Sequence, residues 1–232
     1  MTRRPNYRGR PVLFPLGVIL LIATLAALAA GPSRWLVFLA GVGLVGLLDD
    51  LAAGSARGLR GHARAMAGGR LSTGGIKAIG TVSLAAYAVA GHGAGPKEFV
   101  AAAGVLALSA HAGNLLDTRP ARTEKAFAVG AGTVCIASWS LVPLEPIAAL
   151  IGPVAVCAGL TLRERAMLGD SGASLVGAMV GVVLVATLSV PALWLALAGL
   201  IAISLYGEFR SISSAIERVP LLDRLDSLGR VN

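Results

Sequence analysis

The chain has 232 residues, of which 56% are hydrophobic and only 14% are charged, and its mean hydropathy is +0.78. A soluble domain carries about 25% charged residues, so this composition excludes an ordinary soluble protein. The net charge of +8 comes from basic stretches between long apolar blocks, and no basic helix with interleaved aromatic residues occurs, which excludes nucleic acid as a partner. We therefore expect an all-α, polytopic membrane protein.

Eight apolar blocks are each long enough to cross a bilayer as a helix of about 20 residues. We expect these helices at 12–30, 35–53, 75–91, 98–117, 124–142, 144–161, 171–189 and 191–209. The first block follows several arginines and is similar to a signal peptide, but its full spanning length predicts a retained helix. Gly177 and Gly181 form a GxxxG pair, which is typical of closely packed membrane helices.

The basic residues predict the orientation. With eight spans, 18 of the 20 lysines and arginines fall on one side of the membrane, and Arg34 and Lys97 fall on the other. The positive-inside rule then places both termini in the cytoplasm, with the protein in the plasma or inner membrane. Residues 1–210 are expected to form one transmembrane domain. In the tail, 211–232, apolar residues recur every three or four positions, which predicts an amphipathic segment on the cytoplasmic face.

Four aspartates from three expected helices reach this same face. Asp49 and Asp50 end the second helix, Asp117 ends the fourth and Asp170 begins the seventh. Charged groups at such a depth are costly unless they are paired, solvated or bound to a cation, so they predict a functional site.

The adjacent pair in "GLLDD" is open to two interpretations. Two neighbouring carboxylates repel each other, and a divalent cation relieves that repulsion. Oxygen ligands of this kind favour Mg²⁺, with Mn²⁺ as an alternative. In the other interpretation the pair forms a salt bridge with Arg57 or Arg60 at the membrane surface.

The stretch "HAGNLLDTRPARTEK" also predicts part of a functional site. Asn114 lies one helical turn before Asp117, and Arg119, Arg122 and Lys125 come directly afterwards. A carboxylate, an amide and three cations suit a site for a diphosphate and a metal ion. A solvated loop would explain the cations but not the amide and the carboxylate.

Two further features are weaker alone. In "LGDSGAS", Asp170 and Ser171 open a helix whose backbone N–H groups could hold an anion or orient the carboxylate. The same pattern also fits a plain helix start. His111 lies one turn before Asn114 and either packs inside the bundle or lines the site. Cys135 and Cys157 lie in apolar blocks without metal-ligand spacing and are expected to be packing residues.

In order, "GLLDD", "NLLD" and "LGDSG" resemble the signature of the polyprenyl-phosphate N-acetylhexosamine-1-phosphate transferases. Members of that family transfer a sugar-1-phosphate from a UDP-sugar to a polyprenyl phosphate, with Mg²⁺, at the cytoplasmic face, in the synthesis of cell-envelope glycans. The resemblance covers roughly residues 35–210 and lies in the order of the motifs and the number of helices between them.

The resemblance implies roles for individual residues. Asp49 and Asp50 match the Asp-Asp pair, one member of which is proposed to activate the lipid phosphate or to organise the metal site. Lys77 matches a phosphate-binding lysine. Asn114 and Asp117 match the Asn and the first Asp of an N-x-x-N-L-x-D-G-x-D-G stretch. Asp170 matches a Mg²⁺ ligand. The expected catalytic residues are therefore Asp49, Asp50 and Asp117, and the expected metal ligands are Asp170 and Asp117.

The chain also departs from the family pattern. His111 stands where the family has its first Asn, and Pro120 stands where it has its second Asp. Family members have about ten or eleven spans, and their histidine-rich cytoplasmic loop has no counterpart here. We expect Arg119 and Arg122 to bind phosphate, in place of the missing second Asp, with His111 beside them.

The sequence thus predicts an enzyme, a glycosyl-1-phosphate transferase whose partners are a polyprenyl phosphate, a nucleotide-sugar and the membrane. A homodimer is among the assemblies that the sequence permits. Two alternatives stay open: a family member without catalysis that binds polyprenyl phosphate or acts as a scaffold, and a small transporter. Transport sites usually lie near the bilayer midplane, whereas these carboxylates lie at one face.

Overall fold

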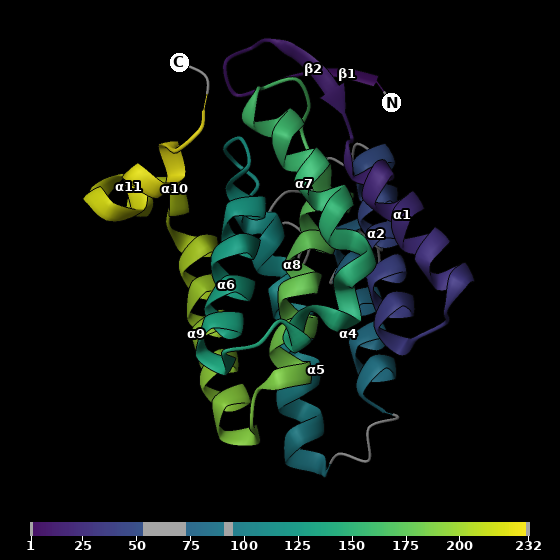
Figure 1. Cartoon of the computed structure of the whole chain (residues 1–232). Helices are drawn as coiled ribbons and strands as arrows, with labels where there is room; N and C mark the ends of the chain where they lie inside the picture. Colours follow the sequence, from purple (N-terminus) through teal and green to yellow (C-terminus); the bar gives the residue numbers. More distant parts are fainter. Residues whose placement is uncertain (1, 53–72, 91–94, 231–232) are drawn as a thin grey trace, which may run out of the picture.

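The computed structural model describes residues 2–52, 73–90 and 95–230, and it confirms the all-α expectation (Figure 1). The strands are β1 (Thr2–Pro5) and β2 (Pro11–Phe14). The helices are α1 (Gly17–Ala30), α2 (Arg34–Ala52), α4 (Thr73–Val89), α5 (Pro96–Leu116), α6 (Arg122–Ser138), the 3-10 helix η1 (Val142–Ile147), α7 (Ala148–Leu162), α8 (Gly169–Thr187), α9 (Val190–Phe209), α10 (Ile212–Arg218) and α11 (Pro220–Ser227). Each of the eight expected segments contains a helix, although the ends differ by a few residues.

Within the described ranges, five helical segments are long and apolar enough to cross a membrane. They are α2, α5, α8, α9 and the continuous segment formed by η1 and α7. Helices α1 and α4 are apolar but shorter. These segments support a membrane protein, while the expected number of eight spans stays a prediction.

Helix α8 is the centre of the bundle and packs against α1, α2, α5 and α6. Small residues allow this packing: a Cβ atom added to Gly177 would lie 2.3 Å from the carbonyl oxygen of Ser109 in α5. One added to Gly181 would lie 3.0 Å from the Cβ of Ser109, and one on Gly113 would lie 2.3 Å from the carbonyl oxygen of Ala173. The GxxxG pair therefore does bring two helix backbones together.

The N-terminal segment is a β-hairpin, and the expectation that the first helix begins at residue 12 was wrong. Residues 12–14 belong to strand β2 (Pro11–Phe14), and α1 begins only at Gly17. Pro11 begins this strand and Pro15 follows it, and proline removes a helical hydrogen bond and disfavours helix in the residue before it. The strand is held by Leu13, whose carbonyl oxygen accepts a hydrogen bond of 2.9 Å from the N–H of Met167.

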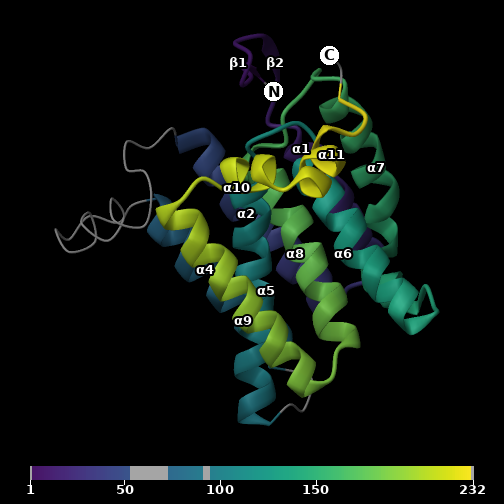
Figure 2. The same ribbon diagram turned by 90° about the vertical axis from the view of Figure 1, so that its left-hand side faces the viewer.

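One end of the bundle carries both termini. In Figure 1 the hairpin and helices α10 and α11 lie at the top, where α2 and α5 end and α8 begins. Figure 2 shows α10 and α11 lying across this end instead of continuing the direction of α9. The four aspartates are therefore placed at the same end as the termini.

Candidate functional site at the start of helix α8

The end of α2 lies directly on the first turn of α8. Gly46 permits this approach, because an added Cβ would lie 2.7 Å from the carbonyl oxygen of Asp170 and from the Cα of Ser171. Any larger side chain at this position would push the two helices apart. This contact delivers Asp49 and Asp50 to the N-terminus of α8.

Asp50 caps α8. Its side chain is buried, and one carboxylate oxygen accepts a hydrogen bond from the backbone N–H of Asp170 (2.8 Å). The other oxygen accepts from the N–H (3.0 Å) and the hydroxyl (2.7 Å) of Ser171. A carboxylate at this end of a helix satisfies otherwise unpaired N–H groups and interacts favourably with the helix dipole. Arg4 of the hairpin donates to the carbonyl oxygen of Asp50 (3.1 Å).

Lys77 of α4 joins three other elements. Its ammonium group donates to a carboxylate oxygen of Asp170 at 2.7 Å and lies 3.7 Å from a carboxylate oxygen of Asp49. In the amide orientation that satisfies both neighbours, Asn114 of α5 donates to the other Asp170 oxygen (3.0 Å) and accepts from Lys77 (3.2 Å). We call these four residues the Lys77 cluster: Asp49, Lys77, Asn114 and Asp170.

Asp117 approaches the same helix turn from the end of α5. The N–H of Gly169 donates to its carboxylate. Burial raises the pKa of Asp117 well above its ordinary value, and the negative charges of Glu124, Asp170 and Asp50 raise it further. Asp49, Asp50 and Asp117 thus lie around residues 169–171, which include the fourth predicted aspartate, Asp170.

A small cavity adjoins Asp117 beneath the N-terminal hairpin. Its volume is about 70 Å³, and its walls include Tyr7, Arg119, Thr161 and Glu164. Space of this size can hold several water molecules.

The Lys77 cluster has the chemistry of a cation site. Its carboxylates come from α2 and α8, and the ammonium group of Lys77 stands between them where a cation is favoured. Lys77 lies beside two carboxylates, Asp49 and Asp170, and its single positive charge can neutralise only one of them. In the part of the chain that the structure describes, no three His, Cys, Asp or Glu side chains are grouped to hold a metal ion. Mg²⁺ commonly takes one or two protein carboxylates together with substrate phosphates and water, so Asp49 and Asp170 fit it without a third.

The two predicted phosphate-binding arginines contact the C-terminal helices instead of the Lys77 cluster. Arg122 is buried and donates to both carboxylate oxygens of Asp226 in α11 (2.8 and 2.7 Å). Arg119 forms a salt bridge of 3.3 Å with Glu217 of α10. The role of these arginines in binding phosphate stays a prediction, and it requires that the arginines exchange their present partners for a ligand.

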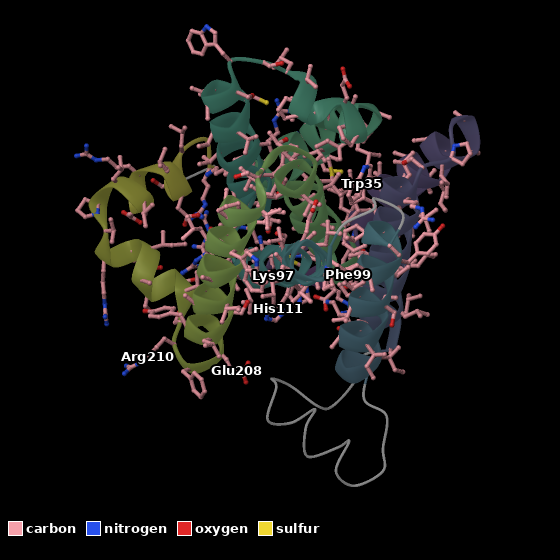
Figure 3. All side chains as sticks on the ribbon, turned by 90° about the horizontal axis from the view of Figure 1, so that it is seen from below. Trp35, Lys97, Phe99, His111, Glu208 and Arg210 are labelled. Carbon is pink, nitrogen blue, oxygen red and sulfur yellow. The ribbon has the colours of Figure 1, made fainter. Side chains whose placement is uncertain are left out.

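His111 lies on the side of α5 between α4 and α9 (Figure 3). It interacts electrostatically with Lys77 of α4 and with Glu208 of α9, which appears on the same side of the bundle. His111 is therefore placed beside the Lys77 cluster but is not among its hydrogen-bonded members. Arg57 and Arg60, the alternative partners of the Asp49–Asp50 pair, lie outside the described residues.

Sequence reasoning missed two anchors of this end of the bundle. Asp226 holds Arg122, as described above. Glu164 accepts hydrogen bonds from Asn6 (3.2 Å) and Tyr7 (3.0 Å) of the hairpin. Both carboxylates occur in polar stretches whose partners are more than 100 residues away, so no local pattern could have indicated either pair.

Compared with protein-family models, with curated proteins and with solved structures, the chain shows no match.

Proposed function

We propose that the protein is a membrane phosphotransferase that moves a sugar-1-phosphate from a nucleotide-sugar, with UDP as the expected carrier, to a polyprenyl phosphate. The observation that carries this proposal is the convergence on one helix turn of carboxylates from three helices, together with Lys77 and Asn114. Such a group can bind a divalent cation and phosphate at the end of an apolar bundle, where a lipid phosphate and a soluble donor can meet. In the membrane orientation that the basic residues predict, the site would face the cytoplasm.

Asp49 and Asp170 would hold Mg²⁺, or Mn²⁺, and Asp117 would be a further ligand. When bound, the ion supplies positive charge that neutralises the diphosphate and stabilises the departing nucleotide monophosphate. Lys77 would orient the phosphate by its ammonium group, and Asn114 would fix the position of Lys77 through its amide oxygen. Asp50, whose oxygens already accept three hydrogen bonds, would position the turn and not touch the substrate.

A second function is a protein that binds polyprenyl phosphate without catalysis. One observation favours it: both predicted phosphate-binding arginines are engaged by the C-terminal helices, and Lys77 already pairs with the carboxylates that would hold the metal ion. A lipid phosphate needs only Lys77 and hydrogen-bond donors, whereas transfer needs the carboxylates to be released for a metal ion.

An assay on the purified, reconstituted protein separates these functions. The protein is incubated with undecaprenyl phosphate, Mg²⁺ and a panel of UDP-sugars, and the release of UMP and the formation of a lipid-linked product are measured together. The transferase predicts both products with at least one donor, and their loss when EDTA removes the metal ion. Lipid binding without UMP from any donor would replace the transferase by the binding protein.

A further inference from the structure

The C-terminal helices present two different surfaces. Helix α9 ends at Phe209, and only Arg210 and Ser211 separate it from α10, so the chain turns sharply where α9 ends. Helices α10 and α11 then lie across the end of the bundle (Figures 1 and 2). A helix in this position has one side toward the bundle and another side that needs its own partner.

Only part of the polar side is bound to the rest of the protein: of its four residues on α11, Asp226 is buried, whereas Asp223, Arg224 and Ser227 are exposed. Asp226, which is 7% exposed, accepts two hydrogen bonds from Arg122 and also pairs with Arg230. Ser213 of α10 accepts a hydrogen bond of 2.8 Å from Arg122 and contacts the hydroxyl of Thr118 at 3.1 Å. These contacts fix the rotation of both helices relative to the bundle.

The apolar side of α11 is uncovered. Four leucines are exposed over this helix and its C-cap: Leu221 (68%), Leu222 (45%), Leu225 (45%) and Leu228 (68%). At 3.6 residues per turn these four lie on one arc of the helix, and Asp223, Arg224, Asp226 and Ser227 lie on the other. A row of exposed leucines on so short a helix marks a contact surface.

The surroundings of α11 indicate a bilayer surface as the partner. Helix α9, directly before it, is a candidate membrane span whose outward residues include exposed Ile201 (43%) and Phe209 (63%). Because α9 ends at Phe209, a membrane that α9 crosses would end close to where α10 begins. Three exposed arginines, Arg210, Arg218 and Arg224, accompany the apolar row and suit anionic headgroups.

We propose that α10 and α11 bind the surface of an anionic bilayer, with Leu221, Leu222, Leu225 and Leu228 entering the interface and Arg218 and Arg224 contacting lipid phosphates. Asp226 then ties this membrane-bound element to Arg122, five residues after Asp117. The inference needs the bundle to span a membrane but does not rest on the transferase activity.

Site-directed spin labelling of the full chain tests the proposal. A nitroxide is attached at Leu225→Cys or, as a matched control two residues away on the opposite side of α11, at Ser227→Cys. Both variants also carry Cys135→Ser and Cys157→Ala, and are used only if they unfold at the same temperature as the unlabelled background. In vesicles of phosphatidylcholine and phosphatidylglycerol, collision with oxygen and with a water-soluble nickel chelate is measured.

The proposal predicts that the oxygen-to-nickel ratio is several-fold higher at position 225 than at 227. Equal, nickel-dominated values would place α11 in water, and protection of position 225 from both reagents would show a protein partner such as a second copy. Either result overturns the proposal. Arg218→Gln with Arg224→Gln should lower the ratio at 225 in these vesicles but not in pure phosphatidylcholine. If the ratio at position 225 changes neither with the two arginine substitutions nor with the removal of phosphatidylglycerol, the binding of anionic lipid is refuted.

Discussion

We predict that the adjacent aspartates of α2 have different roles: Asp50 stabilises the structure, and Asp49 takes part in the chemistry. Asp50→Asn leaves one acceptor oxygen where the carboxylate has two. If that oxygen keeps both hydrogen bonds from Ser171, the N–H of Asp170 loses its partner, which costs about 1–3 kcal/mol. Loss of the negative charge beside the N-terminus of α8 removes about a further 1 kcal/mol. We expect a total destabilisation of about 2–4 kcal/mol.

Asp49→Asn is the matched control. The Asp49 side chain is partly exposed, and its oxygen lies 3.7 Å from the ammonium group of Lys77, so the loss of this pair should cost less than about 1 kcal/mol. The free energy of unfolding is measured for both variants by titration with SDS in mixed micelles. Equal stabilities for the two variants would refute the assignment of Asp50 as the residue that holds α8.

Three other predictions concern the same end and the core of the bundle. Gly177→Ala should destabilise the protein by about 1–3 kcal/mol, because its Cβ would meet the backbone of α5, whereas Gly199→Ala, which meets nothing within 4 Å, should be neutral or gain up to about 1 kcal/mol in the same SDS titration. Asp117→Asn should raise the unfolding temperature at pH 7, since a carboxyl group whose folded pKa is raised contributes stability below its unfolded pKa and loses it as the pH rises; the gain should vanish near pH 3.8, and a gain that persists there would contradict this origin. Burial alone would raise the pKa of Asp226, but the hydrogen bonds and charges of Arg122 and Arg230 lower it. The stabilisation that Asp226 contributes is therefore present above its unfolded pKa and is lost as the pH falls through its folded pKa. Asp226→Asn should therefore cost about 3 kcal/mol at pH 7 and flatten the acid side of the stability profile, and an unchanged profile would exclude this ion pair as its source.

The placement of the carboxylates was readable from the sequence because two independent patterns agree. Long apolar blocks predicted the number of helices between the motifs, and the basic residues predicted one common side for the ends that carry Asp50, Asp117 and Asp170. Helices of similar length that alternate in direction must then bring these ends together. The small residues of α8 likewise predicted a close helix contact, which Gly177 makes with α5.

The separate roles of the residues inside the site could not be predicted from the sequence. Asp49 and Asp50 differ by one residue, which turns the side chain by 100° around α2, and only the packing angle of α2 on α8 decides which one reaches the N-terminus of α8. Arg122 looked like a phosphate ligand because its loop is basic. Its partner Asp226 is 104 residues away, and no local pattern reports such a pair.

The N-terminal error had a different cause. Apolarity alone extended the first helix to residue 12, although Pro11 and Pro15 were both visible in the sequence. Their effect on backbone conformation outweighs the hydropathy of the three residues between them.

The central claim is that the Lys77 cluster performs transfer, and the most direct test compares two lysines at opposite ends of one bundle. UMP release and lipid-linked product are measured for Lys77→Met and for Lys97→Met, an exposed residue at the start of α5, with folding checked by the SDS titration. Asp170→Asn is assayed in parallel. We predict that Lys77→Met and Asp170→Asn lose both products while Lys97→Met keeps the wild-type rate. Full activity in Lys77→Met and Asp170→Asn would contradict the account.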